Sequence, residues 1–382
     1  MPEGRARPLR ILHVLRAPVG GLFRHVRDLA RGQLARGHAV GLIVDSSPGA
    51  TEAEAALDDL APHLALGLSR VAMSRHIGWR DVSAIRHVSR RGAETRPDIV
   101  HGHGAKGGAY SRLVHGPPGI RVYTPHGGSL HFHRHSPLGF AYLTMERILE
   151  PRTDLFLFES AYARDAFLAK VGRISGTTRV IHNGVTAADL EPIEPAPQAA
   201  DFVFVGELRR LKGVHVLIEA VAELASAGRT VRGVIVGSGP DAQAFAALAS
   251  ARGVKALIRF HGPLPAREAF RLGRLLVVPS LAESLPYVVL EAAAAGLPLL
   301  ATRIGGIPEI FGPKTDDLLP PGDASALAKA LAQALDNSPA YRARALELRQ
   351  RVKAAFSADL MVDQVLAAYA EALSASVKLR SN

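Results

Sequence analysis

Two glutamates, Glu283 and Glu291, stand eight residues apart in a segment that otherwise holds small or apolar side chains. Pro286 suits a first helical position and Ser284 can cap the free amides ahead of it, so we predict Glu283 in a loop and Glu291 inside the helix. A carboxylate among apolar side chains is costly without polar partners. The paired hydroxyls of a sugar or ribose are suitable partners, because a carboxylate accepts two hydrogen bonds at once. The alternative interpretation is an exposed helical glutamate beside a capping loop.

A basic loop stands earlier in the same half of the chain. The segment 204–213 runs from a strand-like stretch through Gly206 to the cations Arg209, Arg210 and Lys212. Lys212 stands where the next helix is expected to begin, and a cation beside free backbone amides suits a diphosphate. A solvated basic turn is the alternative, and the two glutamates downstream favour the binding site.

Three glycine pairs also follow strand-like stretches: Gly20 with Gly21, Gly237 with Gly239, and Gly305 with Gly306. Glycine lets the main chain approach a ligand closely, and successive amides can form an anion-accepting nest. Each pair alone is equally compatible with a plain tight turn. The second pair lacks the third glycine of a dinucleotide fingerprint, and no ribose-binding acid follows the next strand, so we exclude a nicotinamide cofactor.

Histidines gather in the first half of the chain: His101, His103, His126, His131, His133 and His135. A metal site needs three or four ligands whose orientation is fixed by further contacts. Arg134 stands among the alternating histidines and would repel a cation, so we expect no metal. His126 differs, because it follows a strand directly, between Pro125 and Gly127. We expect it to donate a hydrogen bond to a sugar or phosphate, as a neutral or cationic ring.

Composition limits the class of protein. A chain of 382 residues, 48% hydrophobic and 21% charged, is globular and long enough for two domains. It has no cysteine, which excludes disulfides and thiolate metal sites. We see neither a signal peptide nor a spanning apolar run, and we expect a cytoplasmic protein. The net charge of +11 calls for an anionic partner unless it is a general compositional bias. With aromatic residues at only 5%, nucleic acid is the least favoured partner.

The elements that must position these residues alternate along the chain. Strand-like and helix-like stretches follow one another in both halves, which predicts α/β domains with parallel sheets and right-handed crossovers. The Pro-rich segment 191–200 lacks periodicity and is expected to be a linker between domains at 1–190 and 201–358. The polar residues described above fall at the carboxyl ends of strands, where open α/β sheets bind ligands. We expect a cleft between the two carboxyl edges.

As a set, these motifs resemble retaining glycosyltransferases of family 4 (glycosyl transferases group 1) over essentially the whole chain. The family has the GT-B fold, two Rossmann-like domains facing across a cleft. The residues that carry the resemblance are Gly20-Gly21, Thr124–Gly127, Asn183–Val185, Gly206–Gly213, Val236–Pro240, Glu283–Glu291 and Gly305–Glu309. The spaced glutamates are the most specific of these.

The resemblance implies a role for each matching residue. Glu283 would contact the hydroxyls of the donor sugar, and Glu291 the ribose diol. Lys212 would hold the donor diphosphate, which the Gly20-Gly21 loop approaches from the first domain, and His126 would lie beside the reacting sugar. The resemblance also implies a last helix, at 359–376, that packs back on the first domain. No metal or other cofactor is expected.

Two positions depart from the family pattern. Glu207 stands where the family usually has an arginine after the glycine matching Gly206, and we expect Arg209, or else Arg210, to supply that charge. Leu285 and Pro286 replace the aromatic residue and glycine that often follow the first glutamate. We count both among the donor-binding residues.

We therefore predict transfer of a sugar from a nucleotide diphosphate donor to a hydroxyl of a saccharide or lipid-linked saccharide, with retained anomeric configuration. Synthesis of an exopolysaccharide, lipopolysaccharide or glycolipid is the expected setting. Apolar and basic residues near 131–152, among them Phe140, Tyr142, Leu143, Arg147 and Arg152, suggest docking on an anionic membrane at its inner face. A nucleotide-sugar epimerase of the same fold and a non-catalytic nucleotide-sugar-binding protein are the alternatives.

Overall fold

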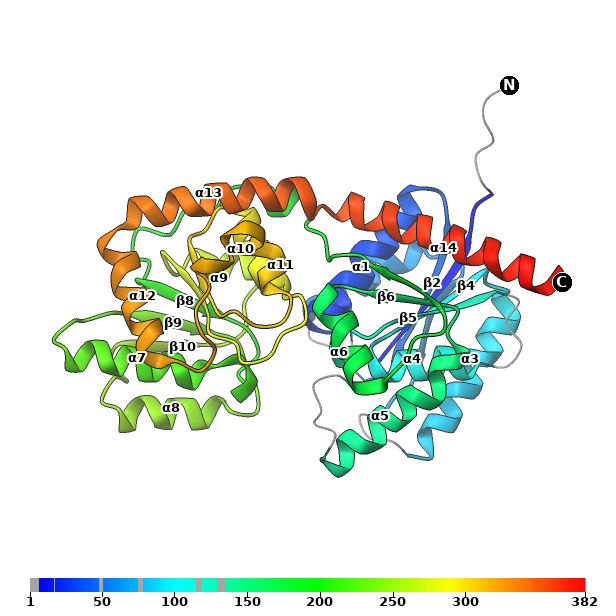
Figure 1. Cartoon of the computed structure of the whole chain (residues 1–382), viewed down its shortest axis with the longest axis horizontal. Coiled ribbons are helices and arrows are strands. Elements are labelled where there is room, and N and C mark those ends of the chain that lie inside the picture. Colours follow the sequence, from blue (N-terminus) through cyan, green and yellow to red (C-terminus); the bar gives the residue numbers. More distant parts are fainter. Residues whose placement is uncertain are drawn as a thin grey trace, which may run out of the picture. The chain divides into compact units, whose positions relative to one another are not determined.

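A computed structural model of the chain describes residues 7–16, 18–47, 51–74, 78–114, 119–128 and 135–381. The chain forms two units, Met1–Gly184 with Ala358–Asn382, and Val185–Ser357, each with helices flanking a sheet (Figure 1). The segment 191–200, expected to be the linker, lies inside the second unit. Its main chain is hydrogen-bonded there; the amide of Ala196, for example, donates to the carbonyl oxygen of Arg271 at 2.9 Å.

The first unit is built on a seven-stranded, entirely parallel sheet with the order β3-β2-β1-β4-β5-β6-β7. Its strands are β1 (Arg10–Leu15), β2 (Ala39–Asp45), β3 (Gly67–Val71), β4 (Ile99–His103), β5 (Ile120–Thr124), β6 (Leu155–Phe158) and β7 (Thr177–Val180). The strand order reverses between β1 and β4. In a doubly wound sheet, ligands bind at the carboxyl ends of the strands beside such a reversal.

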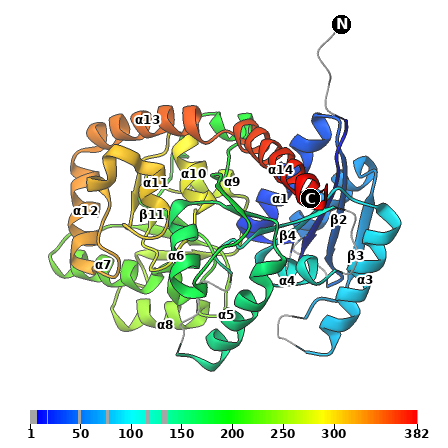
Figure 2. The ribbon, with the colours of Figure 1, turned by 45° about the vertical axis from the view of Figure 1, so that its right-hand side comes forward.

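Helices cover both faces of this sheet (Figure 2). They are α1 (Gly20–Ala35), α2 (Thr51–Leu60), α3 (Arg80–Thr95), α4 (Gly104–Leu113), α5 (Pro137–Leu149), α6 (Ala161–Val171) and α14 (Ala358–Ser381). Successive residues of a strand point to opposite faces. In β1, Ile11 therefore packs with α1 and α14, whereas Leu12 packs with α3 and α4. Each face has its own apolar core.

Helix α14 joins the first unit although it comes from the end of the chain. Its buried Met361, Val362, Val365 and Tyr369 belong to the same core as strands β1, β4, β5 and β6. A side chain at Gly32 of α1 would overlap Val362, so the two helices approach closely only because that position has no Cβ. Such burial contributes about 25 cal/mol per Å2 of apolar surface.

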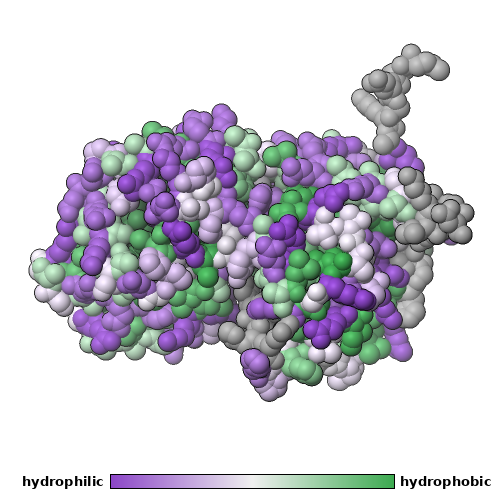
Figure 3. Space-filling view, viewed as in Figure 1, coloured by the Kyte–Doolittle hydropathy of each residue, from purple (hydrophilic) through white to green (hydrophobic). Residues whose placement is uncertain are grey.

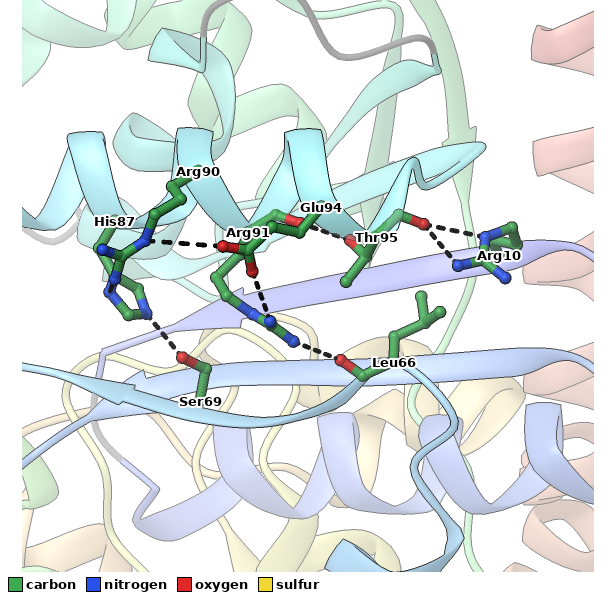
Figure 4. Close-up of polar contacts among 8 residues, drawn as sticks. All are labelled: Arg10, Leu66, Ser69, His87, Arg90, Arg91, Glu94 and Thr95. Carbon is green, nitrogen blue, oxygen red and sulfur yellow. Dashed lines mark hydrogen bonds and ion pairs between the residues drawn. The ribbon is translucent and has the colours of Figure 1, made fainter.

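Polar contacts attach α3 to the edge of the same sheet (Figure 4). The Arg91 guanidinium donates to the carbonyl oxygen of Leu66 at 2.7 Å, and the hydroxyl of Ser69 in β3 bonds the His87 ring at 2.6 Å. At the helix end, Arg10 of β1 donates to the carbonyl oxygen of Thr95. The two arginines satisfy main-chain carbonyl groups just before the edge strand and at the helix terminus.

The second unit has a five-stranded parallel sheet with the order β10-β9-β8-β11-β12. Its strands are β8 (Phe202–Val205), β9 (Gly233–Val236), β10 (Ile258–His261), β11 (Leu276–Val278) and β12 (Leu299–Ala301). Its helices are α7 (Val214–Ser226), α8 (Ala242–Ala251), α9 (Ala266–Phe270), α10 (Tyr287–Ala294), α11 (Ile307–Phe311), α12 (Ala324–Asp336) and α13 (Ser338–Ala355). The predicted pair of doubly wound parallel-sheet domains is confirmed.

Candidate functional site

Lys212 and Glu283 form a close ion pair at the carboxyl edge of the second sheet. The Lys212 Nζ lies 2.7 Å from Oε1 and 2.8 Å from Oε2 of Glu283, and the Ser280 hydroxyl donates to Oε1 at 2.7 Å. The Glu283 side chain is only 8% exposed, whereas that of Lys212 is 25% exposed. A buried carboxylate is thus held by two donors, and the cation that holds it still reaches solvent.

The strand order explains why these two residues meet although 71 positions separate them. Lys212 follows β8 and Glu283 follows β11, and these strands are neighbours in the sheet. Their loops also contact each other through the main chain, because the amide of Leu281 donates to the carbonyl oxygen of Leu211 at 2.8 Å. The carboxyl ends of parallel strands share one edge, so neighbouring strands bring their loops together.

Glycines allow the four loops of this edge to pack against one another. Gly213 has a left-handed backbone with φ of 73°, and a Cβ there would overlap the carbonyl oxygen of Pro279. In the same way Gly305 faces the main chain of Glu283, and Gly237 that of Gly206. These glycines, together with Gly239, are therefore required for loop packing, whether or not a ligand also uses them. The amide of Gly306 is engaged with the carbonyl oxygen of Ser284.

Helix α10 carries Glu291 as expected, and the Glu291 side chain is buried. The helix start differs from the prediction. Pro286 occupies the N-cap and Tyr287 begins the helix, one residue later than expected. That the Ser284 side chain caps free amides there stays a prediction. Leu285 is 4% exposed and packs in the apolar core, so its main chain is what remains for contact with a ligand.

The basic loop after β8 is partly neutralised by its own glutamate. Arg209 lies 3.3 Å from Glu207, and both side chains reach solvent. Arg210 is exposed, and its amide donates to Asp241 at 2.6 Å. Arg209 is thus the less exposed of the two candidate arginines, and its guanidinium already has an anionic partner.

Five histidines form a cluster, hereafter the histidine cluster, in the first unit: His13, His25, His101, His103 and His126. Only His101, His103 and His126 belong to the set noted from the sequence; His131 and His133 lie outside the described residues, and His135 is exposed. The histidines of β1 and β4 lie together because alternate side chains of a strand point to the same face of the sheet. His13 pairs with His101 across β1 and β4, and His103 stands two residues beyond, on the same face.

Hydrogen bonds connect the histidine cluster to its surroundings. His13 bonds Gln33 of α1 at 2.8 Å and His103 at 3.0 Å, and His103 bonds His126 at 3.1 Å. Three further bonds join the cluster to neighbouring residues: His25 to Asn183 at 3.0 Å, His101 to Tyr369 at 2.7 Å, and His101 to Thr124 at 2.8 Å. His13, His25 and Gln33 were missed as functional candidates because each is isolated along the sequence. Asn183 was noted within the motif Asn183–Val185 but was given no role.

Burial keeps these rings neutral. Desolvation lowers the pKa of His13 to about 4, and desolvation with the neighbouring His126 ring lowers that of His25 to about 3. Burial also lowers the pKa values of His101 and His103 well below the ordinary value, and it lowers that of the partly exposed His126. Of the two forms expected for His126, the neutral one is favoured.

Two triads in the cluster bring ring nitrogens within 4.8 Å of one another: His13, His101 and His103, and His25, His103 and His126. In both, however, ring nitrogens already bond to each other or to Gln33, Asn183, Tyr369 and Thr124. A cation would have to break these contacts. That transfer needs no metal stays a prediction.

His126 follows β5 with φ of 50°, an uncommon conformation for a residue with a side chain. Gly20 and Gly21 are exposed and begin α1. Functional sites are where such conformations persist, because the surrounding structure holds them in place. Gly20 has φ of 63°, and open space surrounds the position that a Cβ would take, so its conformation rather than crowding favours glycine.

Comparison with known proteins identifies the family. Residues 19–189 match the model of glycosyltransferase family 4, and residues 199–337 match that of glycosyl transferases group 1. The chain belongs to these glycosyltransferases. It is 29% identical over 374 residues to a glycogen synthase of Mycobacterium tuberculosis, covering 88% of each chain. It is also 41% identical over 144 residues to a D-inositol 3-phosphate glycosyltransferase of Corynebacterium efficiens. That alignment covers 35% of this chain and 34% of the relative.

Solved structures show the same fold at low identity. A sucrose-phosphate synthase from Thermosynechococcus elongatus superposes with a TM-score of 0.79 at 20% identity, covering 96% of the glycosyltransferase and 99% of that chain. HepE of Anabaena, solved with UDP and glucose, gives 0.75 at 18% identity over the same shares. The glycosyltransferase therefore has the GT-B fold.

The predicted membrane patch on α5 is partly wrong. Leu143 is buried, because it packs with Tyr123 and Phe156 in the core between α5 and the sheet. Phe140 is 68% exposed and Ile148 62% exposed. Among the described residues, no helix is long and apolar enough to cross a membrane. On the face drawn in Figure 3, hydrophilic and hydrophobic residues are interspersed over both units.

Proposed function

We propose that the glycosyltransferase moves a sugar from a nucleotide diphosphate donor to a hydroxyl of a saccharide or lipid-linked saccharide, with retention and without a metal ion. The observation that carries the proposal is the contact of Lys212 with the buried carboxylate of Glu283. A cation therefore stands beside a carboxylate that can accept hydrogen bonds from sugar hydroxyls, at the carboxyl edge of a Rossmann-like sheet. Family membership and fold support the same assignment.

Lys212 and Arg209 would stabilise the charge that develops on the departing diphosphate. An ammonium group has three N–H donors, and in the structure two of its close contacts go to Glu283. The remaining donor is available to a phosphate oxygen. As the bond from the anomeric carbon to the diphosphate breaks, the acceptor oxygen bonds that carbon from the same face, and the hydroxyl proton passes to the diphosphate. Preorganised donors of this kind account for about a hundred- to a thousand-fold in rate.

Glu283 would accept hydrogen bonds from the donor sugar and Glu291 from the ribose, with Gly206, Gly237, Gly239, Leu285, Pro286, Gly305 and Gly306 as further donor-binding positions. In the first unit, Gly20, Gly21 and His126 have the corresponding roles. HepE and a trehalose-6-phosphate protein of E. coli were solved with UDP-glucose and UDP-2-fluoro glucose. UDP-hexoses are therefore the first donors to test.

The proposal is tested by a thermal-shift screen of nucleotide sugars, followed by turnover with the donor that stabilises most. Lys212→Ala and Glu291→Ala should each lower turnover at least a hundred-fold. Near-unchanged rates in both would refute the site. The anomeric proton coupling of the product, measured by NMR, decides retention, and turnover after dialysis against a chelator decides the need for metal.

One observation favours the non-catalytic alternative: Glu207 engages Arg209, the candidate for the family's arginine. Tight donor binding without transfer or hydrolysis would support that alternative, and Glu207→Arg should then restore turnover. An epimerase would instead isomerise the donor without any acceptor, which NMR of donor and protein alone detects.

We further propose that the glycosyltransferase is cytoplasmic and docks peripherally on an anionic membrane through α5, in the synthesis of an exopolysaccharide, lipopolysaccharide or glycolipid. Phe140 is 68% exposed on α5, with Arg147 and Arg152 also exposed nearby in the chain. Flotation with vesicles containing phosphatidylglycerol tests this. Phe140→Asp should abolish binding, whereas Trp79→Asp, at a 79% exposed aromatic residue that precedes α3, should not. Equal binding of both variants would refute docking through α5.

A further inference from the structure

Three of the clustered histidines and one glutamine lie in a single hydrogen-bonded chain. It runs from Gln33 through His13 and His103 to His126, with successive distances of 2.8, 3.0 and 3.1 Å. Gln33 and His13 are fully buried, His103 is 1% exposed, and His126 is partly exposed. The chain thus connects the core between α1 and the sheet to the carboxyl end of β5.

Neutral imidazole has one donor and one acceptor nitrogen, so the proton positions along such a chain depend on one another. With the Gln33 amide oxygen facing His13, the Nε2 of His13 must donate and its Nδ1 must accept. His103 then donates from Nε2 to His13 and accepts at Nδ1. His126 in turn must donate from Nε2 to His103, which leaves its own Nδ1 as an acceptor.

We propose that Gln33, His13 and His103 are positioning residues that hold His126 in the Nε2–H tautomer, with Nδ1 free to accept a hydrogen bond from a hydroxyl of the donor sugar. The last step rests on the proposed function, because it needs His126 beside the donor. The chain itself is independent of that function. It also provides a reason for the conformation of His126, since the bond to His103 holds the ring while the backbone has φ of 50°.

The assignment depends on all the rings being neutral, and the surroundings favour this. Burial lowers the pKa of each member, and the groups that pack around the chain are the neutral His25, His101, Tyr369 and Thr124. Glu159 is the nearby carboxylate, and its charge acts on His25, outside the chain. A protonated ring would have two donors and would break the sequence of bonds.

The direct test is the tautomer of each histidine in the ligand-free full-length protein at pH 7.5, measured from the nitrogen-15 shifts of the rings. We expect the Nε2–H form for His13, His103 and His126. An Nδ1–H form or an imidazolium at His126 would overturn the proposal. So would stoichiometric zinc in the purified protein that disappears in His103→Gln, because the ring nitrogens would then serve as metal ligands.

The functional test compares two substitutions at the same site. His103→Leu removes the acceptor for His126, whereas His103→Gln keeps an oxygen that can accept the same bond. We expect kcat to fall about tenfold in the leucine variant, with the donor KM within threefold, and the glutamine variant to recover most of the loss. Equal losses in both would show a merely structural role.

Gln33→Met tests the far end of the chain, and Tyr110→Phe, on the opposite face of the same sheet, is its matched control. Each removes one hydrogen bond of a buried side chain, but only the first belongs to the chain. The nitrogen shifts of His126 should change in Gln33→Met and stay constant in Tyr110→Phe. If neither variant changes these shifts, the role of the hydrogen-bonded chain is refuted even when the protein is active. If the wild type transfers no sugar, the proposed function fails, and the shifts still decide whether the chain holds the His126 tautomer.

Discussion

Removal of the Lys212 charge should weaken the second unit and the reaction by separate, measurable amounts. Lys212→Met would leave the Glu283 carboxylate, 8% exposed, with the Ser280 hydroxyl as a remaining donor. Breaking a fully buried pair costs about 3–5 kcal/mol. Because a quarter of the lysine side chain is exposed and the hydroxyl remains, we expect a loss of about 2 kcal/mol in the free energy of unfolding of this unit.

Glu283→Gln should behave differently, because the amide keeps an acceptor oxygen and the partly exposed Lys212 can be hydrated. We expect a loss of about 1 kcal/mol or less. In a double-mutant cycle, the two substitutions should show a coupling of about 1–2 kcal/mol. Turnover should fall about a hundred- to a thousand-fold in Lys212→Met, because the developing phosphate charge loses its cation.

The measurements are urea unfolding, followed by hydrogen exchange of amides in β8 and β11, and turnover at saturating donor. Arg229→Met is the matched control, because it breaks an exposed ion pair with Asp336 in the same unit. It should leave stability and turnover close to those of the wild type. The reasoning is refuted if Lys212→Met unfolds no more easily than this control, or if it keeps more than a tenth of wild-type turnover.

Three other outcomes follow from the described contacts. Glu146→Gln should cost about 3 kcal/mol in urea unfolding, because its arginine partner is 1% exposed; a loss below 1 kcal/mol would contradict this. His13 and His25 have folded pKa values of about 4 and about 3, below the ordinary value, so the unfolded chain binds their protons first as the pH falls. Hydrogen exchange in β1 should show full stability above pH 6.5 and a loss of about 1.4 kcal/mol per histidine and pH unit below it; a flat profile from pH 7.5 to 5.5 would refute their burial as neutral rings. Gly213→Ala should cost more than about 2 kcal/mol, because a Cβ meets a main-chain oxygen, whereas Gly228→Ala, with similar φ and open space, should cost only about 1 kcal/mol; equal losses would contradict the close packing.

Local patterns were sufficient to predict the fold. Alternating strand and helix stretches predicted two parallel doubly wound sheets, and the sheets have that order. The predicted linker was placed too late, because Pro-rich composition reports the absence of regular structure and not the absence of contacts. The main chain of 191–200 finds hydrogen-bond partners in the second unit, among them the carbonyl oxygen of Arg271.

The side chains around Glu283 were predicted less well, for physical reasons that local patterns do not contain. Pro286 lacks an amide hydrogen and was therefore placed at the first helical position, but the structure uses it as the N-cap. Leu285 was counted as a donor-binding residue, and its side chain fills the core instead. Whether an apolar residue beside a site faces the ligand or the core depends on tertiary packing.

Strand order determines which polar residues meet. It explains why the site around Lys212 and Glu283 was predicted and why His13 was overlooked. In each unit the first strand lies between the second and the fourth. This order brings the loop after β8 to the loop after β11, and so Lys212 to Glu283. It likewise brings β1 beside β4, and so His13 beside His101. The glutamate motif drew attention to the first meeting, whereas His13 was overlooked because clustering was sought along the sequence. Comparing same-parity residues of the first and fourth strands of each predicted doubly wound sheet would have placed His13 with His101 and His103.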